Sequence, residues 1–289
     1  MKLYNLGSLN IDYVYSVPHF VAAGETLAST RMEVFPGGKG LNQSVALAKA
    51  GVPVIHGGMV GDGGEFLLQT LRDAGADISR IQKVTGSCGH AIIQVTESGE
   101  NCILLHAGTN RAITEDYVQT FLQDAEVGDV LLLQNEVNNL PYIFSVAQEK
   151  GMRIAFNPSP YDESLKDLPL ASVKWLFCNE VEGAAFFGDG TPEELAARFA
   201  VQYPDSTLIL TLGKDGSLLK TVQKTVYQPI FQTEVVDTTA AGDTFTGYFL
   251  AAILQGKTEE VALKMASRAA AITVSRKGAS CAIPTFEEL

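Results

Sequence analysis

Apolar runs that alternate with helical segments constrain the fold of this chain most strongly. From residue 113 onward, each unbroken apolar run is followed by a segment with helical periodicity. Strands are expected at 130–133, 153–156, 173–177 and 207–210, and helices near 114–125, 139–150, 180–187, 192–202, 241–255 and 259–274. Unbroken apolar strands are typical of a parallel sheet covered on both faces. The pattern predicts an α/β fold with a doubly wound, mostly parallel sheet flanked by helices, with residues 1–289 as one domain.

Polar or glycine-rich segments follow the expected strands. They are Gln134-Asn-Glu136, Asn157-Pro158, Asn179-Glu-Val-Glu182, Thr211-Leu-Gly-Lys-Asp-Gly216 and Asp237, where a further short strand over 235–237 is expected to end. In open α/β sheets, ligands bind outside the carboxyl ends of the strands. One such segment can be an ordinary helix cap. Several at the same edge predict a single ligand-binding crevice.

The segment from Val235 to Leu254 is expected to form that short strand, a turn of small residues and then an apolar helix. Ala240, Ala241 and Gly242 carry little side chain, so the N–H groups of this helix start can approach an anion such as phosphate. Asp243 has two interpretations. It is either a helix-capping acid or the base that takes the proton from an acceptor hydroxyl during phosphoryl transfer.

Two polar segments near the N-terminus suit a polyhydroxylated ligand. Asn10 and Asp12 follow a strand over residues 2–6 and face one side if the chain is extended, although a polar turn is equally consistent with the sequence. The segment Pro36-Gly-Gly-Lys-Gly-Leu-Asn42 opens a helix and contains two side-chain donors. It does not match a Walker A loop, and alone it is also typical of a tight turn.

Residues 13–35 and 86–107 lack a helical pattern and are expected to form a small sheet apart from the main one. His90 and His106 lie in this region. A lone histidine is more often packed or exposed than a ligand.

The composition excludes some classes of function. A net charge of −12 and a pI near 4.8 argue against nucleic-acid binding, because no basic excess is present to neutralise phosphates. No apolar run approaches the roughly 20 residues of a membrane helix, so no membrane partner is expected. The four cysteines show no CxxC spacing, and we expect them to be reduced in a cytoplasmic protein.

Between Gly7 and Pro284, the chain closely resembles the ribokinase-like (PfkB) carbohydrate kinases, and most closely those that phosphorylate ribose. Asp237-Thr-Thr-Ala-Ala-Gly-Asp243 is the most specific part of the likeness. The other matching segments, in chain order, are Gly7-Ser-Leu-Asn-Ile-Asp12, Gly37-Gly-Lys-Gly-Leu-Asn42, Gly58-Met-Val-Gly-Asp-Gly-Gly64, His106-Ala-Gly-Thr-Asn110, Asn157-Pro158, Asn179-x-x-Glu182, Thr211-Leu-Gly-x-x-Gly216 and Arg276-Lys-Gly278.

The resemblance implies a ribokinase-like fold whose small sheet, residues 13–35 and 86–107, is a lid. It implies Asp243 as catalytic base, with an anion hole at Ala240, Ala241, Gly242 and Asp243. The sugar would be held by Asn10, Asp12, Gly38, Lys39, Gly40, Asn42, Glu136 and Asp243. ATP with Mg²⁺ would be bound by Asn179, Glu182, Thr211, Gly213, Lys214, Gly216 and Gly242. A monovalent cation, K⁺, would be bound by Asp237, Thr239, Thr273, Arg276 and Gly278, largely through carbonyl oxygens.

The resemblance also implies a substrate and a partner. D-Ribose is the expected acceptor and a homodimer through the lid the expected assembly. Another pentose or a nucleoside (deoxyribose, pseudouridine) is an alternative acceptor, and a sugar-binding regulator without turnover is an alternative function. Three positions depart from the family pattern: Ala282 near the cation site, Ser267 near the adenine, and His90 in the lid, where a polar residue could alter sugar choice.

Overall fold

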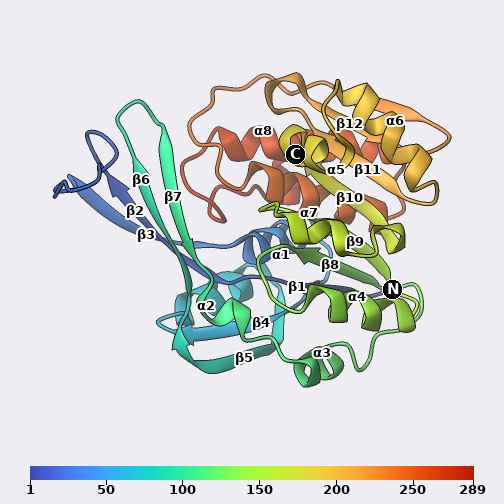
Figure 1. The fold of residues 1–289 in the computed structure, drawn as a ribbon, viewed down its shortest axis with the longest axis horizontal. Helices are drawn as coiled ribbons and strands as arrows, with labels where there is room; N and C mark the ends of the chain where they lie inside the picture. The colour runs from blue at the N-terminus through green and yellow to red at the C-terminus, as the bar shows by residue number, and fades with distance from the viewer.

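A nine-stranded sheet forms the centre of the molecule, in a computed structural model that describes residues 1–289 (Figure 1). Its strand order is β13-β12-β11-β10-β9-β8-β1-β4-β5. In that order the strands span Thr225–Gln228, Ser217–Lys220, Thr207–Thr211, Val173–Asn179, Arg153–Asn157, Val130–Gln134, Leu3–Leu6, Ile55–Asp62 and Asp77–Ser87. All neighbours pair in parallel except β11 with β12 and β12 with β13.

Helices cover both faces of this sheet and separate two apolar cores. The helices span Lys39–Lys49 (α1), Glu65–Ala74 (α2), Glu115–Phe121 (α3), Leu140–Glu149 (α4), Glu180–Phe187 (α5), Pro192–Gln202 (α6), Ala241–Leu254 (α7) and Glu259–Val274 (α8). One core joins α1, α2, α7 and α8 to one face, and the other joins α3 to α6 to the opposite face. Successive residues of β8 alternate between the cores, because side chains alternate across a strand.

A four-stranded small sheet projects from one side of this body (Figure 1). Its order is β3-β2-β6-β7, and the strands span Arg31–Gly37, Asn10–Ser16, Gly89–Val95 and Asn101–His106. Strands β2 and β3 are inserted between β1 and α1, and β6 and β7 follow β5. The base of the small sheet therefore lies beside the carboxyl end of β1.

Strand β1 is also the point where the chain order of the large sheet reverses. It pairs with β4 on one side and with β8 on the other. A crevice opens at such a reversal because the connections leave the two neighbouring strands in opposite directions. The carboxyl end of β1 thus brings together the first residues of the small sheet and the start of α1.

The fold class predicted from the sequence is confirmed, and the predicted helices and apolar strands after residue 113 agree with the structure within a few residues. The predicted strand at 235–237 is wrong. Val235 and Val236 are exposed, and the N–H groups of Val236 and Asp237 donate to Val274 O at the end of α8. These bonds join the segment to the end of α8 and not to a strand, so apolar residues alone do not make it a strand. None of the helices combines the length and hydropathy needed to cross a bilayer.

The contact between α1 and α7 requires a glycine. A Cβ on Gly247 would lie 2.4 Å from Ala46 Cβ. Alanine is usually favoured over glycine inside a helix by about 1 kcal/mol, but here it would push the two helices apart.

We expect Gly247→Ala to lower the free energy of unfolding by about 2 kcal/mol in urea denaturation. Gly183→Ala in α5 is the control, because its nearest neighbours at 3.1 and 3.5 Å are flexible leucine ends. Equal stability of the two variants would contradict this packing argument.

Candidate active site

The start of α7 presents free N–H groups to a cavity. Ala240 precedes the helix in the left-handed region at φ 61°, which is uncommon for a residue with a Cβ. The first intrahelical bond runs from Thr244 N to Ala240 O at 2.8 Å, so Gly242 N and Asp243 N have no intrahelical partner. A Cβ on Gly242 would meet nothing within 4 Å. This helix start can therefore receive an anion.

The side chain of Asp243 turns away from its own helix end and contacts α1. Asn42 Nδ2 donates to its Oδ2 at 3.0 Å, and Gln43 Nε2 donates to its Oδ1 at 2.9 Å. Asp243 is buried, with 7% of its surface exposed, yet it lines the cavity at the start of α7. The structure shows no capping bond by this side chain. Its geometry suits a carboxylate held in place for a ligand better than a helix-capping acid.

The candidate sugar residues meet where α1 begins. A Cβ on Gly40 would lie 2.3 Å from Ser8 N, so only glycine lets α1 approach the end of β1 this closely. Lys39 N donates to Glu136 Oε2 at 2.9 Å, and Ser8 Oγ donates to the same oxygen. Both of these bonds go to Oε2, so Oε1 of Glu136 can accept from a ligand.

Three other candidates complete this end of the site. Asn10 is buried and accepts a hydrogen bond from Asn110 Nδ2 at 2.7 Å. Asn42 Oδ1 is buried without a hydrogen-bond partner, which suits an acceptor for a sugar hydroxyl. Gly38, at φ 95°, precedes α1 and turns the chain out of β3 into the helix.

Charge is concentrated at this site. Burial, followed by the nearby Glu136 carboxylate, raises the pKa of Asp12 to about 7, with Asp243 adding to the shift. Burial acts to lower the pKa of the Lys39 ammonium, but the surrounding carboxylates, Asp243 foremost, outweigh it and hold that pKa above its ordinary value. Lys39 is thus the central cation among acidic side chains from both ends of the cavity.

Asn179 and Glu182 line the same cavity, of about 230 Å³, as Asp243 and Lys39. They also form a capping box at the start of α5. Asn179 Oδ1 accepts from Glu182 N at 2.8 Å, and Glu182 Oε2 accepts from Asn179 N at 3.0 Å. One amide nitrogen and one carboxylate oxygen of the pair remain free of these bonds. The structure therefore gives both residues a structural role in addition to any contact with a metal–phosphate group.

A second cavity, of about 420 Å³, continues from the first past the start of α7 and shares Thr211, Ala241 and Gly242 with it. Its other lining residues include the remaining nucleotide candidates and four large apolar side chains, namely Gly213, Lys214, Gly216, Ile230, Phe231, Val235 and Phe245. Ser267 lines it as well. A polar cavity that opens into an apolar slot fits a triphosphate followed by a flat base.

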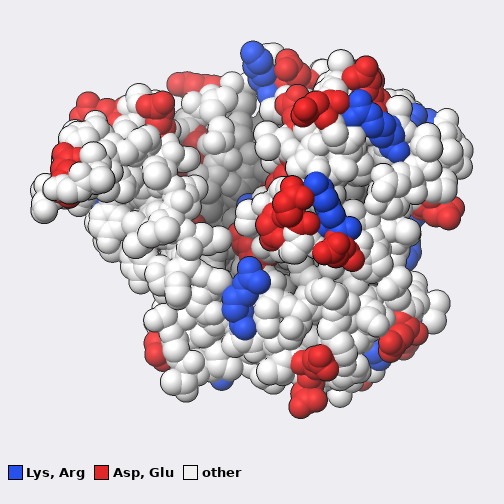
Figure 2. All heavy atoms as spheres, in the orientation of Figure 1, with Lys and Arg blue, Asp and Glu red and all other residues white.

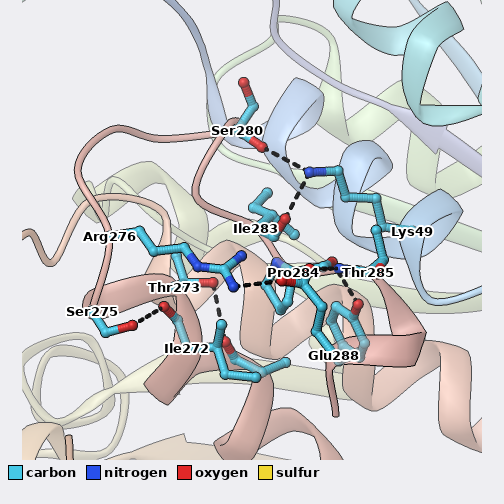
Figure 3. A network of polar contacts seen from close by, with 12 residues as sticks. Lys49, Ile272, Thr273, Ser275, Arg276, Ser280, Ile283, Pro284, Thr285 and Glu288 are labelled. Atoms are coloured by element: carbon cyan, nitrogen blue, oxygen red, sulfur yellow. Dashed lines mark hydrogen bonds and ion pairs between the residues drawn. The ribbon is translucent and has the colours of Figure 1, made fainter.

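The candidate cation residues come together on the other side of the helix start. Asp237 Oδ1 accepts from Thr239 N at 2.9 Å, and Asp237 Oδ2 accepts from Gly278 N at 3.0 Å. Thr273 Oγ1 is directed into the interface of α8 with α7, where it contacts Thr244 Oγ1 at 3.0 Å. Arg276 Nη2 pairs with Glu288 Oε1 at 2.5 Å (Figure 3). These contacts occupy the side chains, so a monovalent cation in this loop would depend on carbonyl oxygens; Thr273 O also accepts from Arg276 N at 3.1 Å.

The small sheet faces the site with one side only. Asp12 pairs with Ala91, whereas His90 pairs with Ile11 and His106. Paired residues share a face, so His90 lies on the face opposite Asp12, where its ring contacts Tyr13 at 6.0 Å. The structure therefore does not support His90 as a residue that lines the sugar site. Alternation along the strand could have shown this from the sequence.

One ion pair joins the small sheet to the main body. Lys277 Nζ lies 2.8 Å from Glu33 Oε2, linking the loop after α8 to β3. Figure 2 shows a hollow between the lobe that carries the small sheet and the rest of the molecule. The ion pair spans elements on the two sides of this hollow.

Sequence reasoning missed two side chains that shape the site. Gln43 holds Asp243, and Ser8 holds Glu136. Both are fully buried polar residues. In the sequence, only their neighbours point to them: Gln43 follows Asn42, and Ser8 lies two residues before Asn10.

Comparison with known proteins decides the family. The model of the pfkB family carbohydrate kinases matches residues 2–285. The chain belongs to this family. It is 34% identical to the ribokinase of Haemophilus influenzae, over 98% of this chain and 95% of that protein. It is 28% identical to the deoxyribokinase of Salmonella typhi, over 100% and 97%.

The fold of this family member matches solved structures throughout its length. The Arabidopsis thaliana ribokinase complexed with ribose and ATP superposes with a TM-score of 0.88 at 27% identity, covering 99% of this chain and 96% of that one. The large sheet and the separate small sheet are therefore common to both proteins.

The raised pKa of Asp12 makes a prediction about stability. Its ordinary value is 3.8 and its value in the fold is about 7, so between these pH values the folded state binds more protons than the unfolded state. Asp12 thus costs stability as pH rises through this range. We expect Asp12→Asn to be more stable than the parent protein by about 2 to 4 kcal/mol near pH 8, and by little near pH 4. Urea unfolding across this pH range measures the difference in stability between the two proteins. A difference that does not grow with pH would contradict the raised pKa of Asp12.

Proposed function

We propose that this family member transfers the γ-phosphoryl group of ATP to D-ribose and forms ribose 5-phosphate. The observation that carries the proposal is the position of Asp243, where the hydroxyl-binding residues of α1 meet the anion-binding start of α7. A base and an anion hole on adjacent residues are what transfer between a hydroxyl and a phosphate requires. The ribokinase relatives support ribose as the acceptor.

In this proposal, the sugar lies between the small sheet and α1. Asp12, Asn10 and Asn42 bind its hydroxyls, and the free oxygen of Glu136 accepts from another. The backbone of Gly38 and Gly40 permits this close approach. The reacting hydroxyl then points at Asp243, which accepts its proton as the bond to phosphorus forms. The ADP oxygen receives the electrons of the bond that breaks.

The phosphates in turn lie against the start of α7. The N–H groups of Gly242 and Asp243 stabilise the transferring group. Ala240 and Ala241 form the turn that directs them, with Ala241 N donating to Thr238 O at 3.3 Å. The Lys39 ammonium adds a positive charge beside them. Thr211, Gly213, Lys214 and Gly216 lie along the second cavity, where the nucleoside of ATP fits.

Two metal ions belong to the proposal. Asn179 and Glu182 would organise Mg²⁺ on the triphosphate through the groups that their capping box leaves free. Mg²⁺ neutralises phosphate charge when it is bound. The carbonyl groups of Asp237, Thr239, Thr273, Arg276 and Gly278 would hold K⁺ beside the anion hole. Ala282 removes no carbonyl from this set, so its departure from the family pattern does not exclude the site.

Two alternatives follow from specific observations. Deoxyribose is a candidate acceptor because of the deoxyribokinase relative, and a nucleoside such as pseudouridine would require more room under the small sheet. A regulator that binds sugar without turnover predicts a missing base or metal organiser. Asp243, Asn179 and Glu182 are all present and line one cavity, which argues against the regulator.

Release of ADP across a panel of pentoses, hexoses and nucleosides, with and without K⁺, tests the function. We expect D-ribose to give the highest kcat/KM and K⁺ to raise it.

Asp243→Asn should lose about 100-fold or more in kcat while sugar KM stays nearly constant, because only the proton acceptor is removed. Near-normal turnover of this variant would overturn the role of Asp243. Absence of turnover with every acceptor would favour the regulator.

We also propose a homodimer through the outer face of the small sheet. Met32, Val34, Ile92 and Leu104 share the face opposite Asp12 and are each between 37% and 67% exposed. A contiguous apolar face of this kind marks an interaction surface.

The proposed location of the protein is the cytoplasm, in keeping with its four free cysteines.

Sedimentation velocity tests the dimer. We expect the parent protein to sediment as a dimer and Leu104→Glu as a monomer, because a buried unpaired charge opposes association. Val201→Glu is the matched control, since Val201 is 85% exposed and its helix α6 lies far from the small sheet (Figure 1). A monomeric parent protein, or a dimeric Leu104→Glu variant, would contradict the proposed surface.

A further inference from the structure

A chain of buried polar side chains runs from Asp243 into the core beneath the site. Gln43 Nε2 donates to Asp243 Oδ1 at 2.9 Å, and Gln134 Nε2 donates to Gln43 Oε1 at 2.7 Å and to Asn5 Oδ1 at 3.0 Å. Asn5 Nδ2 donates to Ser44 Oγ at 2.7 Å, and Ser44 Oγ lies 2.7 Å from His56 Nδ1. We call these five residues after Asp243 the amide chain. Their side chains are 0 to 1% exposed.

The charge of Asp243 determines the direction of every bond in the amide chain. A carboxylate only accepts hydrogen bonds, so Gln43 has to turn its NH₂ group toward Asp243 and its carbonyl toward Gln134. The same choice then passes to Gln134 and Asn5. Ser44 accepts from Asn5, which leaves its single hydrogen for His56 Nδ1.

The chain ends on a neutral ring. Burial lowers the pKa of His56 to about 3, so the ring is neutral. Because the single hydrogen of Ser44 is directed at Nδ1, Nδ1 accepts and Nε2 carries the hydrogen, without a hydrogen-bond partner. The donor and the acceptor of each hydrogen bond in the chain are therefore fixed. Gln43 and Gln134 point their NH₂ groups toward Asp243, whereas Asn5 points its NH₂ group the other way, toward Ser44. The two consecutive hydrogen bonds from Gln134 through Gln43 to Asp243 strengthen one another.

Buried amides are costly unless they are satisfied, and an apolar core would fill the same space at lower cost. The chain also lies under the reversal of the large sheet, with Asn5 on β1 and Gln134 at the end of β8. These residues do not line either cavity. Their position suggests a role that acts on Asp243 and not on a ligand directly.

We infer that Gln43, supported by the amide chain, is the positioning residue of this kinase: it holds the Asp243 carboxylate in the orientation that accepts the proton of the sugar hydroxyl. The inference rests on the proposed function, in which Asp243 is the base. Asn42 holds the other oxygen but also faces the sugar. Gln43 is therefore the residue whose removal affects orientation without removing a sugar contact.

Two substitutions at Gln43 separate positioning from simple packing. Gln43→Leu keeps the side-chain volume and removes the donor, so we expect kcat to fall about 10- to 100-fold while sugar KM changes less than about threefold. Gln43→Glu can still donate to Asp243, but only while it holds a proton. Its kcat, relative to that of the parent enzyme at the same pH, should therefore fall as pH rises from about 5.5 to 8.5; the comparison removes the titration of Asp12, which both proteins share.

Gln255→Leu is the matched control. Gln255 joins the other ends of the same two helices, donating from Nε2 to Ala50 O at 3.0 Å, and its loss should leave kcat and the pH profile within about twofold. Turnover of Gln43→Leu within twofold of the parent enzyme would overturn the inference. A pH profile of Gln43→Glu that matches the parent enzyme would overturn it as well.

A readout without turnover distinguishes this inference from the proposed function. In Gln43→Glu the new carboxylate faces Asp243, so the folded state retains a proton that the unfolded state loses. The variant should lose stability as pH rises, relative to the parent protein. Gln43→Glu/Asp243→Asn should lose less, because burial still raises the pKa of the new carboxyl but the charge of Asp243 is gone. A weaker pH dependence in the double variant supports the chain even if no acceptor is phosphorylated. Identical pH dependence of both variants rejects the chain even in an active kinase.

Discussion

The hydrogen bonds from α1 to the Asp243 carboxylate are the contact on which the site depends. Asn42 and Gln43 are consecutive residues, so their side chains leave α1 in directions about 100° apart. Both nevertheless reach the same carboxylate, one along the sugar side and the other from the core. This requires α1 and α7 to pack closely, which the absence of a side chain on Gly247 permits. The hydroxyl-binding and phosphate-binding halves are thereby held in one geometry.

Electrostatics explains how an acidic protein can bind a nucleotide. The chain has a net charge of −12, and four carboxylates lie around the half-buried Lys39 of the site. Backbone N–H groups at the start of α7 add positive partial charge without adding a side chain. Lys39 offsets the carboxylates in the first cavity. The binding of an anion therefore depends on local groups that are aimed at it, against the overall field.

Much of the fold could be predicted from the sequence because the buried strands are continuous apolar runs. The segment 235–237 shows the limit, since an apolar run is a strand only where a sheet edge is available. Asn179 and Glu182 show a second limit, because the same spacing serves a capping box and a ligand site. Gln43 could not be identified, because a glutamine within a helix is usually exposed. Its burial follows from a glycine contact between α1 and α7, which are distant in the sequence.

A structure of the kinase with D-ribose and a non-hydrolysable ATP analogue tests the central claim most directly. The account predicts the 5-hydroxyl of ribose within about 3 Å of an Asp243 carboxylate oxygen, in line with a γ-phosphate that accepts from the N–H groups of Gly242 and Asp243. It also predicts that Gln43 Nε2 still donates to Asp243 Oδ1 in that complex. A reacting hydroxyl directed at another side chain, or a γ-phosphate bound away from the start of α7, would contradict it.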